Sequence, residues 1–173
     1  QFATVTNTTR LGVSAGDAVF GKFINCDFNW SAAAQGFLLQ NGRWEFSKLT
    51  ISGTAPTSLI STTADGGRIL VENSDLSGLV VTNLVNAGTA NGSHIIFRNG
   101  KMPAFTNVIT GTIPAVGGNV VEMFNCDSAD THIRYARYTY QGSIVQESTI
   151  VPTPGASDGD TAFSLKLVSL ATG

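Results

Sequence analysis

The fold of this chain is set by a recurring motif whose clearest copy is Gly67-Arg68-Ile69-Leu70-Val71-Glu72-Asn73-Ser74-Asp75-Leu76. In this motif a glycine opens a short apolar stretch with the alternation and β-branched content of a strand. Six such openings recur at intervals of 21–26 residues, at Gly21, Gly42, Gly67, Gly92, Gly118 and Gly142. A period of this size predicts a solenoid, in which each repeat buries its apolar side against its neighbours.

Each copy of the motif ends in the pattern apolar, any, polar, any, any, apolar. The six copies begin at Phe23, Phe46, Val71, Phe97, Met123 and Val145. Four of them carry Asn at the polar position, namely Asn25, Asn73, Asn99 and Asn125. Asn tolerates left-handed backbone angles, stacked amides can hydrogen-bond to one another, and glycine suits a second sharp bend. We therefore predict that the six glycines and the four asparagines are structural corners.

A second apolar segment follows in each repeat, before a loop of varied length. These segments are residues 36–39, 58–60, 79–81, 105–109 and 133–135. With no helical period, the pattern predicts an all-β chain folded as a parallel β-helix of about six coils over residues 21–151. An antiparallel sandwich also fits the density of strands, although it would not require a period near 25 residues.

The two ends of the chain lack the motif. We expect residues 1–20 to form a cap or lead-in, and residues 152–173 to form a linker followed by the start of a C-terminal β segment. Ala162 to Leu170 alternate as a strand does. Since Gln1-Phe2-Ala3 is neither an initiator methionine nor a signal peptide, we expect a piece of a longer polypeptide.

Composition argues against several classes of partner. The net charge is −2 and only 13% of residues are charged, which gives no basic footprint for nucleic acid. No apolar run approaches the roughly 20 residues needed for membrane insertion. Cys26 and Cys126 occupy the same place in repeats four coils apart, roughly 19 Å at the usual strand spacing, so we predict two buried thiols rather than a disulfide. We predict no metal or cofactor, and interpret Asp158-Gly159-Asp160 as a turn rather than a Ca²⁺ site.

We assign no catalytic residue. Glycosidases need two carboxyl groups roughly 5–10 Å apart, and two pairs could be neighbours on an outer face, Asp27 with Glu45 and Asp75 with Glu72, but neither has an aromatic cluster in the same column on consecutive repeats. We interpret these acids as solvated. His94 and His132 lie in different repeats without a partner at a telling spacing.

An aromatic and basic stripe gives the candidate contact site. Alternating side chains of such a stripe suit a sugar ring or a partner subunit, because Tyr and Arg are favoured at the centres of interfaces. Ordinary packing under a loop is the alternative. The residues of the stripe are Arg134, Tyr135, Arg137, Tyr138 and Tyr140.

The closing sequence Gly155-Ala156-Ser157-Asp158-Gly159-Asp160-Thr161-Ala162-Phe163-Ser164-Leu165-Lys166, following Gly-rich coils, resembles virion structural proteins of tailed bacteriophages. It departs from their pattern at Asp160, where Thr is more usual. The resemblance implies a right-handed parallel β-helix, a homotrimer, and a place in a tailspike, fibre or head decoration. The expected partners are then other copies of the chain, other virion proteins and a host surface glycan. The alternatives are a glycan-degrading tailspike depolymerase domain and a secreted β-helix adhesin.

Overall fold

The computed structural model describes residues 10–11, 20–30, 36–39, 42–62, 67–88, 92–111, 118–129, 131–141, 144–152 and 161–169. For residues 10–11 and from residue 140 onward it describes the backbone alone. Throughout these ranges the chain is all-β. None of the described segments is a helix of the length and hydropathy that would span a bilayer.

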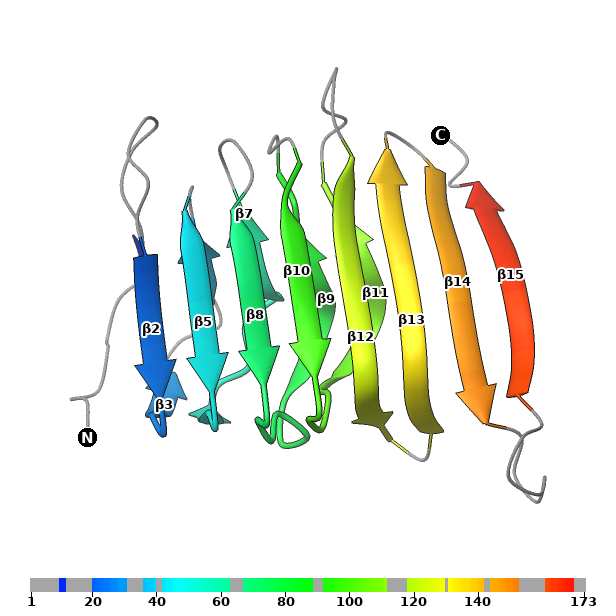
Figure 1. Cartoon of the computed structure of the whole chain (residues 1–173). Helices are drawn as coiled ribbons and strands as arrows, with labels where there is room; N and C mark the ends of the chain where they lie inside the picture. The colour runs from blue at the N-terminus through cyan, green and yellow to red at the C-terminus, as the bar shows by residue number, and fades with distance from the viewer. Residues whose placement is uncertain are drawn as a thin grey trace.

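One large sheet runs the length of the molecule (Figure 1). Its first five strands are parallel, and each comes from a successive repeat. The last three strands continue the same sheet with antiparallel pairing. In spatial order the eight strands are β2 (Phe20–Ile24), β5 (Arg43–Ser47), β8 (Arg68–Glu72), β10 (His94–Arg98), β12 (Asn119–Ser128), β13 (Thr131–Gln141), β14 (Ile144–Pro152) and β15 (Thr161–Ser169).

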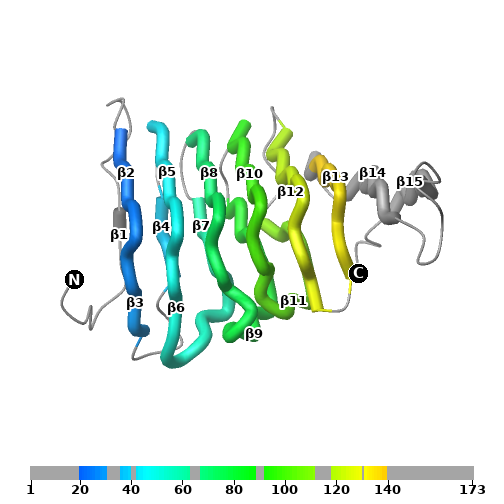
Figure 2. Tube along the Cα trace, turned by 60° about the horizontal axis from the view of Figure 1, so that its bottom comes forward, coloured from blue at the N-terminus to red at the C-terminus, as the bar shows by residue number. Residues whose placement is uncertain are grey.

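Two further sides close the solenoid. A five-stranded parallel sheet contains β1 (Arg10–Leu11), β4 (Phe37–Leu39), β7 (Ser58–Thr62), β9 (Val80–Asn86) and β11 (Ala104–Thr110). The third side is short: β3 (Asp27–Trp30) pairs with β6 (Thr50–Gly53), and single bridges extend it to Asp75, Lys101 and Asp127. Figure 2 shows strands of the same side lying next to one another along the stack. The chain is therefore a β-solenoid, as the period predicts.

The solenoid has about three turns rather than the six predicted. Three complete coils, β5–β7, β8–β9 and β10–β11, each stack on a preceding parallel coil. The fifth and sixth copies of the motif do not make further coils. After β12 the chain reverses, so that the predicted segment 133–135 lies in β13, and Val145 and Ile150 lie in β14.

The core pattern predicts the register of the parallel coils correctly. Phe23, Phe46, Val71, Phe97 and Met123 stand level in neighbouring strands of the large sheet. The last apolar members, Phe28, Ile51, Leu76 and Met102, are all buried. Position 128, where the fifth copy has Ser, is the point at which the parallel stack ends.

The glycines align less well than the core pattern does. Gly21 lies inside β2 level with Trp44 and is not a corner; a Cβ there would lie 2.3 Å from the Trp44 ring, so the glycine is needed for close approach. Gly42 and Gly92 do have positive φ, of 85° and 68°. Ser93, not Gly92, stands level with Gly67, because His94 pairs with Arg68. The pairing of β10 with β12 places Gly118 level with Gly92, so Gly118 is likewise one residue out of line with Gly67. Gly142 lies outside the described residues.

The core changes character along the stack. In the first coils it is aromatic, with Phe46 stacked on Phe23 at 5.3 Å and Phe37 edge-on to Trp30 at the same distance. Farther along it is aliphatic, and Ile69, Ile95 and Val121 are fully buried. Burial of this kind removes apolar area from water at about 25 cal/mol per Å², and it is the main stabilising contribution. Most of the lead-in, 1–9 and 12–19, and the linker 153–160 lie outside the described residues.

Candidate functional site

A column of corner residues borders the third side of the solenoid. Asn25, Lys48, Asn73, Asn99 and Asn125 all have φ between 51° and 55°, the left-handed region that Asn tolerates better than most residues. The backbone N–H of each of the first four donates to a carbonyl oxygen of the following coil, as Asn99 does to Phe124 at 2.9 Å. The bend of one coil is thereby fixed by the next coil.

At three corners the side chain of the following residue hydrogen-bonds to the backbone of the bend. The Sγ–H of Cys26 and of Cys126 donates to the carbonyl oxygen two residues earlier, at 3.4 Å in both cases. The hydroxyl of Ser74 makes the same bond at 2.9 Å and accepts from the backbone N–H of Leu49. Both cysteines are buried and free, as predicted. Burial raises the pKa of the Cys126 thiol, and the site is structural rather than reactive.

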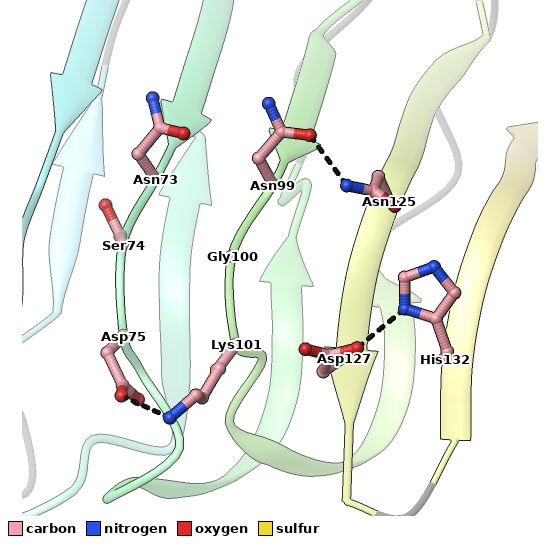
Figure 3. A pocket seen from close by; sticks show the side chains of 9 residues that line it. All are labelled: Asn73, Ser74, Asp75, Asn99, Gly100, Lys101, Asn125, Asp127 and His132. Atoms are coloured by element: carbon pink, nitrogen blue, oxygen red, sulfur yellow. Dashed lines mark hydrogen bonds and ion pairs between the residues drawn. The ribbon is translucent and has the colours of Figure 1, made fainter.

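A surface groove of ≈ 350 Å³ runs along this column. Figure 3 shows the asparagines on one side of it, the charged residues on the other, and His132 beyond Asp127. Neighbouring coils approach closely at Gly100 in its lining, where a Cβ would lie 2.6 Å from the Ser74 carbonyl oxygen. The lining residues are Asn73, Ser74, Asp75, Asn99, Gly100, Lys101, Asn125, Asp127 and His132.

The groove side chains form a row of hydrogen-bonding groups along the stack. The amide of Asn125 donates to Asn99 Oδ1 at 3.1 Å. On the opposite side Lys101 Nζ lies 3.0 Å from Asp75 Oδ2, and His132 Nδ1 lies 2.7 Å from Asp127 Oδ1. These four side chains are 46–58% exposed, so solvent screens the pairs and leaves the groups able to exchange partners.

The electrostatics of the groove suit binding. The Ser77 hydroxyl and then Lys101 hold the pKa of Asp75 below its ordinary value, which keeps the carboxylate ionised. An ionised carboxylate accepts hydrogen bonds but does not supply the proton that glycoside cleavage needs. Alternating amide, ammonium and carboxylate groups can instead bind a chain of hydroxyl groups through several hydrogen bonds. Among the described residues no group of three or more His, Cys, Asp or Glu is placed to hold a metal ion.

The aromatic and basic stripe does not share one surface. Tyr138 stands level with Val121 on the inner side of the sheet and is only 9% exposed, so it is not available to a glycan. Arg137 and Tyr135 point to the opposite face, and Arg134 is exposed level with Asn125. The side chain of Tyr140 lies outside the described residues. Strand alternation in β13 separates these residues, since successive side chains point to opposite faces.

A second polar cluster lies on the outer face of the large sheet. Glu122 Oε2 in β12 lies 2.6 Å from His94 Nε2, and Glu122 Oε1 accepts a hydrogen bond from the Tyr135 hydroxyl at 3.0 Å. Burial would raise the pKa of Glu122, but the bonds with His94 and Tyr135 outweigh it and lower the pKa below 4.5. Burial, followed by the bond to Glu122, raises the pKa of Tyr135. The cluster joins the last two parallel strands to the first antiparallel one.

The two acid pairs considered from the sequence are not brought together as pairs. Glu45 bonds to Lys22 and Arg43 on the outer face, whereas Asp27 lies on the third side. Asp75 bonds to Lys101, and Glu72 ends β8 on the other side of the corner. Sequence reasoning missed the groove, although its signal was present: Asp75, Lys101 and Asp127 each lie two residues after a corner asparagine.

Comparison of the chain with protein-family models, with curated proteins and with solved structures finds no match.

Proposed function

We propose that this chain is a rigid β-helical segment of a phage virion protein, of the decoration, fibre or tailspike type. Its role would be assembly of the particle or attachment to a host surface, and it would act as a homotrimer alongside other virion proteins. The resemblance of residues 155–166 to such proteins supports the virion assignment. The stacked coils supply the stiffness that a rod requires. The right hand of the helix is proposed on the general preference for right-handed parallel crossovers.

The observation that carries the attachment role is the groove along the corner column. Its asparagine amides recur in successive coils, and Asp75, Lys101 and Asp127 follow one another in the same direction, so a linear ligand lying in the groove would meet a hydrogen-bonding group in each coil. Hydroxyl-rich polymers bind through such series of hydrogen bonds, each of modest net strength. A host surface glycan is therefore the ligand class that we propose for the groove.

The virion assignment is tested by the copy number of the chain in purified particles. Quantitative mass spectrometry against the major capsid protein should detect the chain as a stoichiometric component. A copy number near that of the capsid protein supports head decoration, and a few copies per particle support a tail or fibre. Particles that lack the chain altogether would overturn the assignment.

The attachment role is tested with a panel of neutral and acidic bacterial surface polysaccharides. Lys101→Ala and His132→Ala should each weaken binding to a recognised polysaccharide by about tenfold, the effect of losing one hydrogen bond to a charged group. Thr82→Ala is the matched control, because Thr82 is exposed on β9, away from the groove. Equal affinity for all three variants would remove the groove from consideration. Release of new reducing ends would favour the depolymerase alternative.

A further inference from the structure

We propose that the outer face of the large sheet, from β2 to β12, is the surface through which copies of this chain dock side by side with their rods parallel. The inference deepens the proposed rod role by naming the face that one copy presents to another. In this arrangement the residues that begin the strands of one copy face the residues that end the strands of the next.

The outer face consists of three columns that follow from the pairing register. The start column contains Phe20, Arg43, Arg68, His94 and Val120. The middle column contains Lys22, Glu45, Leu70, Ile96 and Glu122. The end column contains Ile24, Ser47, Glu72, Arg98 and Phe124. Their side chains point away from the solenoid core, because the residues between them in each strand point into it.

The two ends of this face are apolar in both outer columns. Phe20 is 60% exposed and Ile24 is 54% exposed, and they begin and end the same strand. At the other end of the stack Val120 and Phe124 are half-buried and likewise sit at matching places in one strand. A neighbouring copy that placed its end column against this start column would cover Phe20 with Ile24 and Val120 with Phe124. Large exposed apolar side chains on a flat face are typical of interaction sites.

At the level of β8 the face is complementary in charge under the same arrangement. Arg68 begins β8 and Glu72 ends it, so the start column carries a cation at the level where the end column carries an anion. Within the described part of the chain neither side chain forms an ion pair, and Arg68 instead stands beside Arg43 in the neighbouring strand. Like charges side by side in a sheet are unfavourable, and a carboxylate from a second copy would offset the repulsion.

The centre of the face offers a place for apolar contact between copies. A surface hollow of ≈ 270 Å³ lies there, with Leu70 and Ile96 among the residues that line it and Arg43, Arg68 and Arg98 around it. Protein interfaces combine an apolar centre with arginines in this way. At the level of β5, Arg43 of one copy would meet Ser47 of the other. At the level of β10, His94 would meet Arg98 of the other copy, and Glu122, which His94 contacts in its own chain, lies next to them.

A rotation about an axis parallel to the stack produces this pairing. Such a rotation keeps every coil at its own level and brings the start column of one copy to the end column of another. Residues four apart in a single strand therefore meet across the interface, which makes charge reversal a direct test. A second copy is the occupant that fits the apolar side chains at the levels of β2 and β12 and the charges at the level of β8.

The experiment measures the association of the whole chain by sedimentation velocity over a range of concentrations. Arg68→Glu and Glu72→Arg should each raise the dissociation constant by about tenfold or more, because each places like charges opposite one another. The double variant Arg68→Glu/Glu72→Arg should recover association to within about threefold of the original chain, since the pair is restored in reverse. Lys48→Glu, a charge reversal in the corner column away from this face, should leave association unchanged.

Thermal melting of every variant accompanies these measurements, because Glu72→Arg places a second cation beside Arg98. The proposal is overturned if the original chain stays monomeric, if the single variants associate as it does, or if the double variant is as weak as the singles. Should the chain be missing from particles while the reversed pair recovers association, the virion assignment fails and the docking face stands.

Discussion

The parallel coils and the antiparallel strands β13–β15 belong to one continuous sheet, but their neighbours come from different distances along the chain. In the coils each strand pairs with one that lies 23–28 residues away, as Phe23 does with Phe46 and Arg10 with Leu38. Each coil must therefore complete a full circuit with a left-handed corner. In the antiparallel part the chain only reverses, as it does between Ser128 and Thr131.

The change occurs where the core pattern loses its last apolar residue. Leu76 and Met102 are buried and anchor the short third side after the corner. The equivalent position in β12 is Ser128, which follows the corner at Asn125 and the bridge of Asp127 to Lys101, and there the chain turns back at Ala129, which has a φ of 49°. Continuation of the chain around the third side is favoured when the residue beyond the corner has apolar area to bury. The comparison teaches that the apolar residue after the corner, and not the corner asparagine alone, keeps the chain in a coil.

The largest expected effect is the difference in stability lost when a buried side chain is truncated in the coils and in the antiparallel strands. Phe97 is 1% exposed at the centre of the coil stack, and Phe97→Ala should lower the free energy of unfolding by about 3–5 kcal/mol. Ala136 occupies the same column in β13, next to Met123, and Ala136→Gly should cost about 1 kcal/mol. Urea unfolding monitored by circular dichroism measures both. Equal losses for the two variants would contradict a core centred on the coils.

The second effect tests the corner itself. Asn99→Leu places a β-carbon chain at a φ of 51° and removes the hydrogen bond with Asn125, so it should cost about 2 kcal/mol. Asn99→Gly removes the same hydrogen bond but tolerates the backbone angle, and should cost about 1 kcal/mol or less. The difference in melting temperature between Asn99→Leu and Asn99→Gly measures the backbone strain, and the difference between Asn99→Gly and the original chain measures the lost hydrogen bond. An unchanged melting temperature for Asn99→Leu would show that the corner asparagine is dispensable.

The repeated core pattern and the repeated glycines differ in how well they predict the fold from the sequence. The core pattern predicts the solenoid and its register because buried side chains of equivalent coils contact one another directly, as Phe46 and Phe23 do. Glycines predict register poorly because glycine meets different needs, such as room for Trp44 at Gly21 and a bend at Gly42. The antiparallel end was missed because Val145, Glu147 and Ile150 keep the motif spacing in a strand that pairs differently.

The candidate site was less accessible to sequence reasoning. Its residues are ordinary in composition, and the common spacing of Asp75, Lys101 and Asp127 after the corner asparagines indicates a row only once the parallel register is known. Tyr138 was misplaced because the interpretation grouped β13 side chains of both faces. Pairs such as His94 with Glu122 join residues 28 positions apart, and no local sequence pattern predicts such a contact.

The third effect tests the cluster that joins the two regions through β12. Despite burial, the bonds with His94 and Tyr135 hold the pKa of Glu122 below its ordinary value in the folded chain, so its contribution to stability is present above the ordinary carboxyl pKa and is lost as the pH falls through the folded pKa. Glu122→Gln should therefore destabilise the chain by about 1 kcal/mol near neutral pH, and the difference should shrink in acid. Urea unfolding across the pH range measures this. A difference that is constant with pH would exclude the carboxylate as its source.

The smallest expected effect is the gain in stability from placing Asn at the one corner of these coils that lacks it. Lys48 is the one corner residue among Asn25, Lys48, Asn73, Asn99 and Asn125 that is not Asn, yet its φ is 54°. Asn is several-fold enriched in this left-handed region, which corresponds to about 0.5 kcal/mol in favour of Lys48→Asn. Lys48→Gln removes the charge without providing that preference, so it should leave the melting temperature unchanged. If Lys48→Asn fails to raise the melting temperature above that of Lys48→Gln, backbone preference does not limit this corner, and the inter-coil bond from Lys48 N–H to the Glu72 carbonyl oxygen alone fixes it.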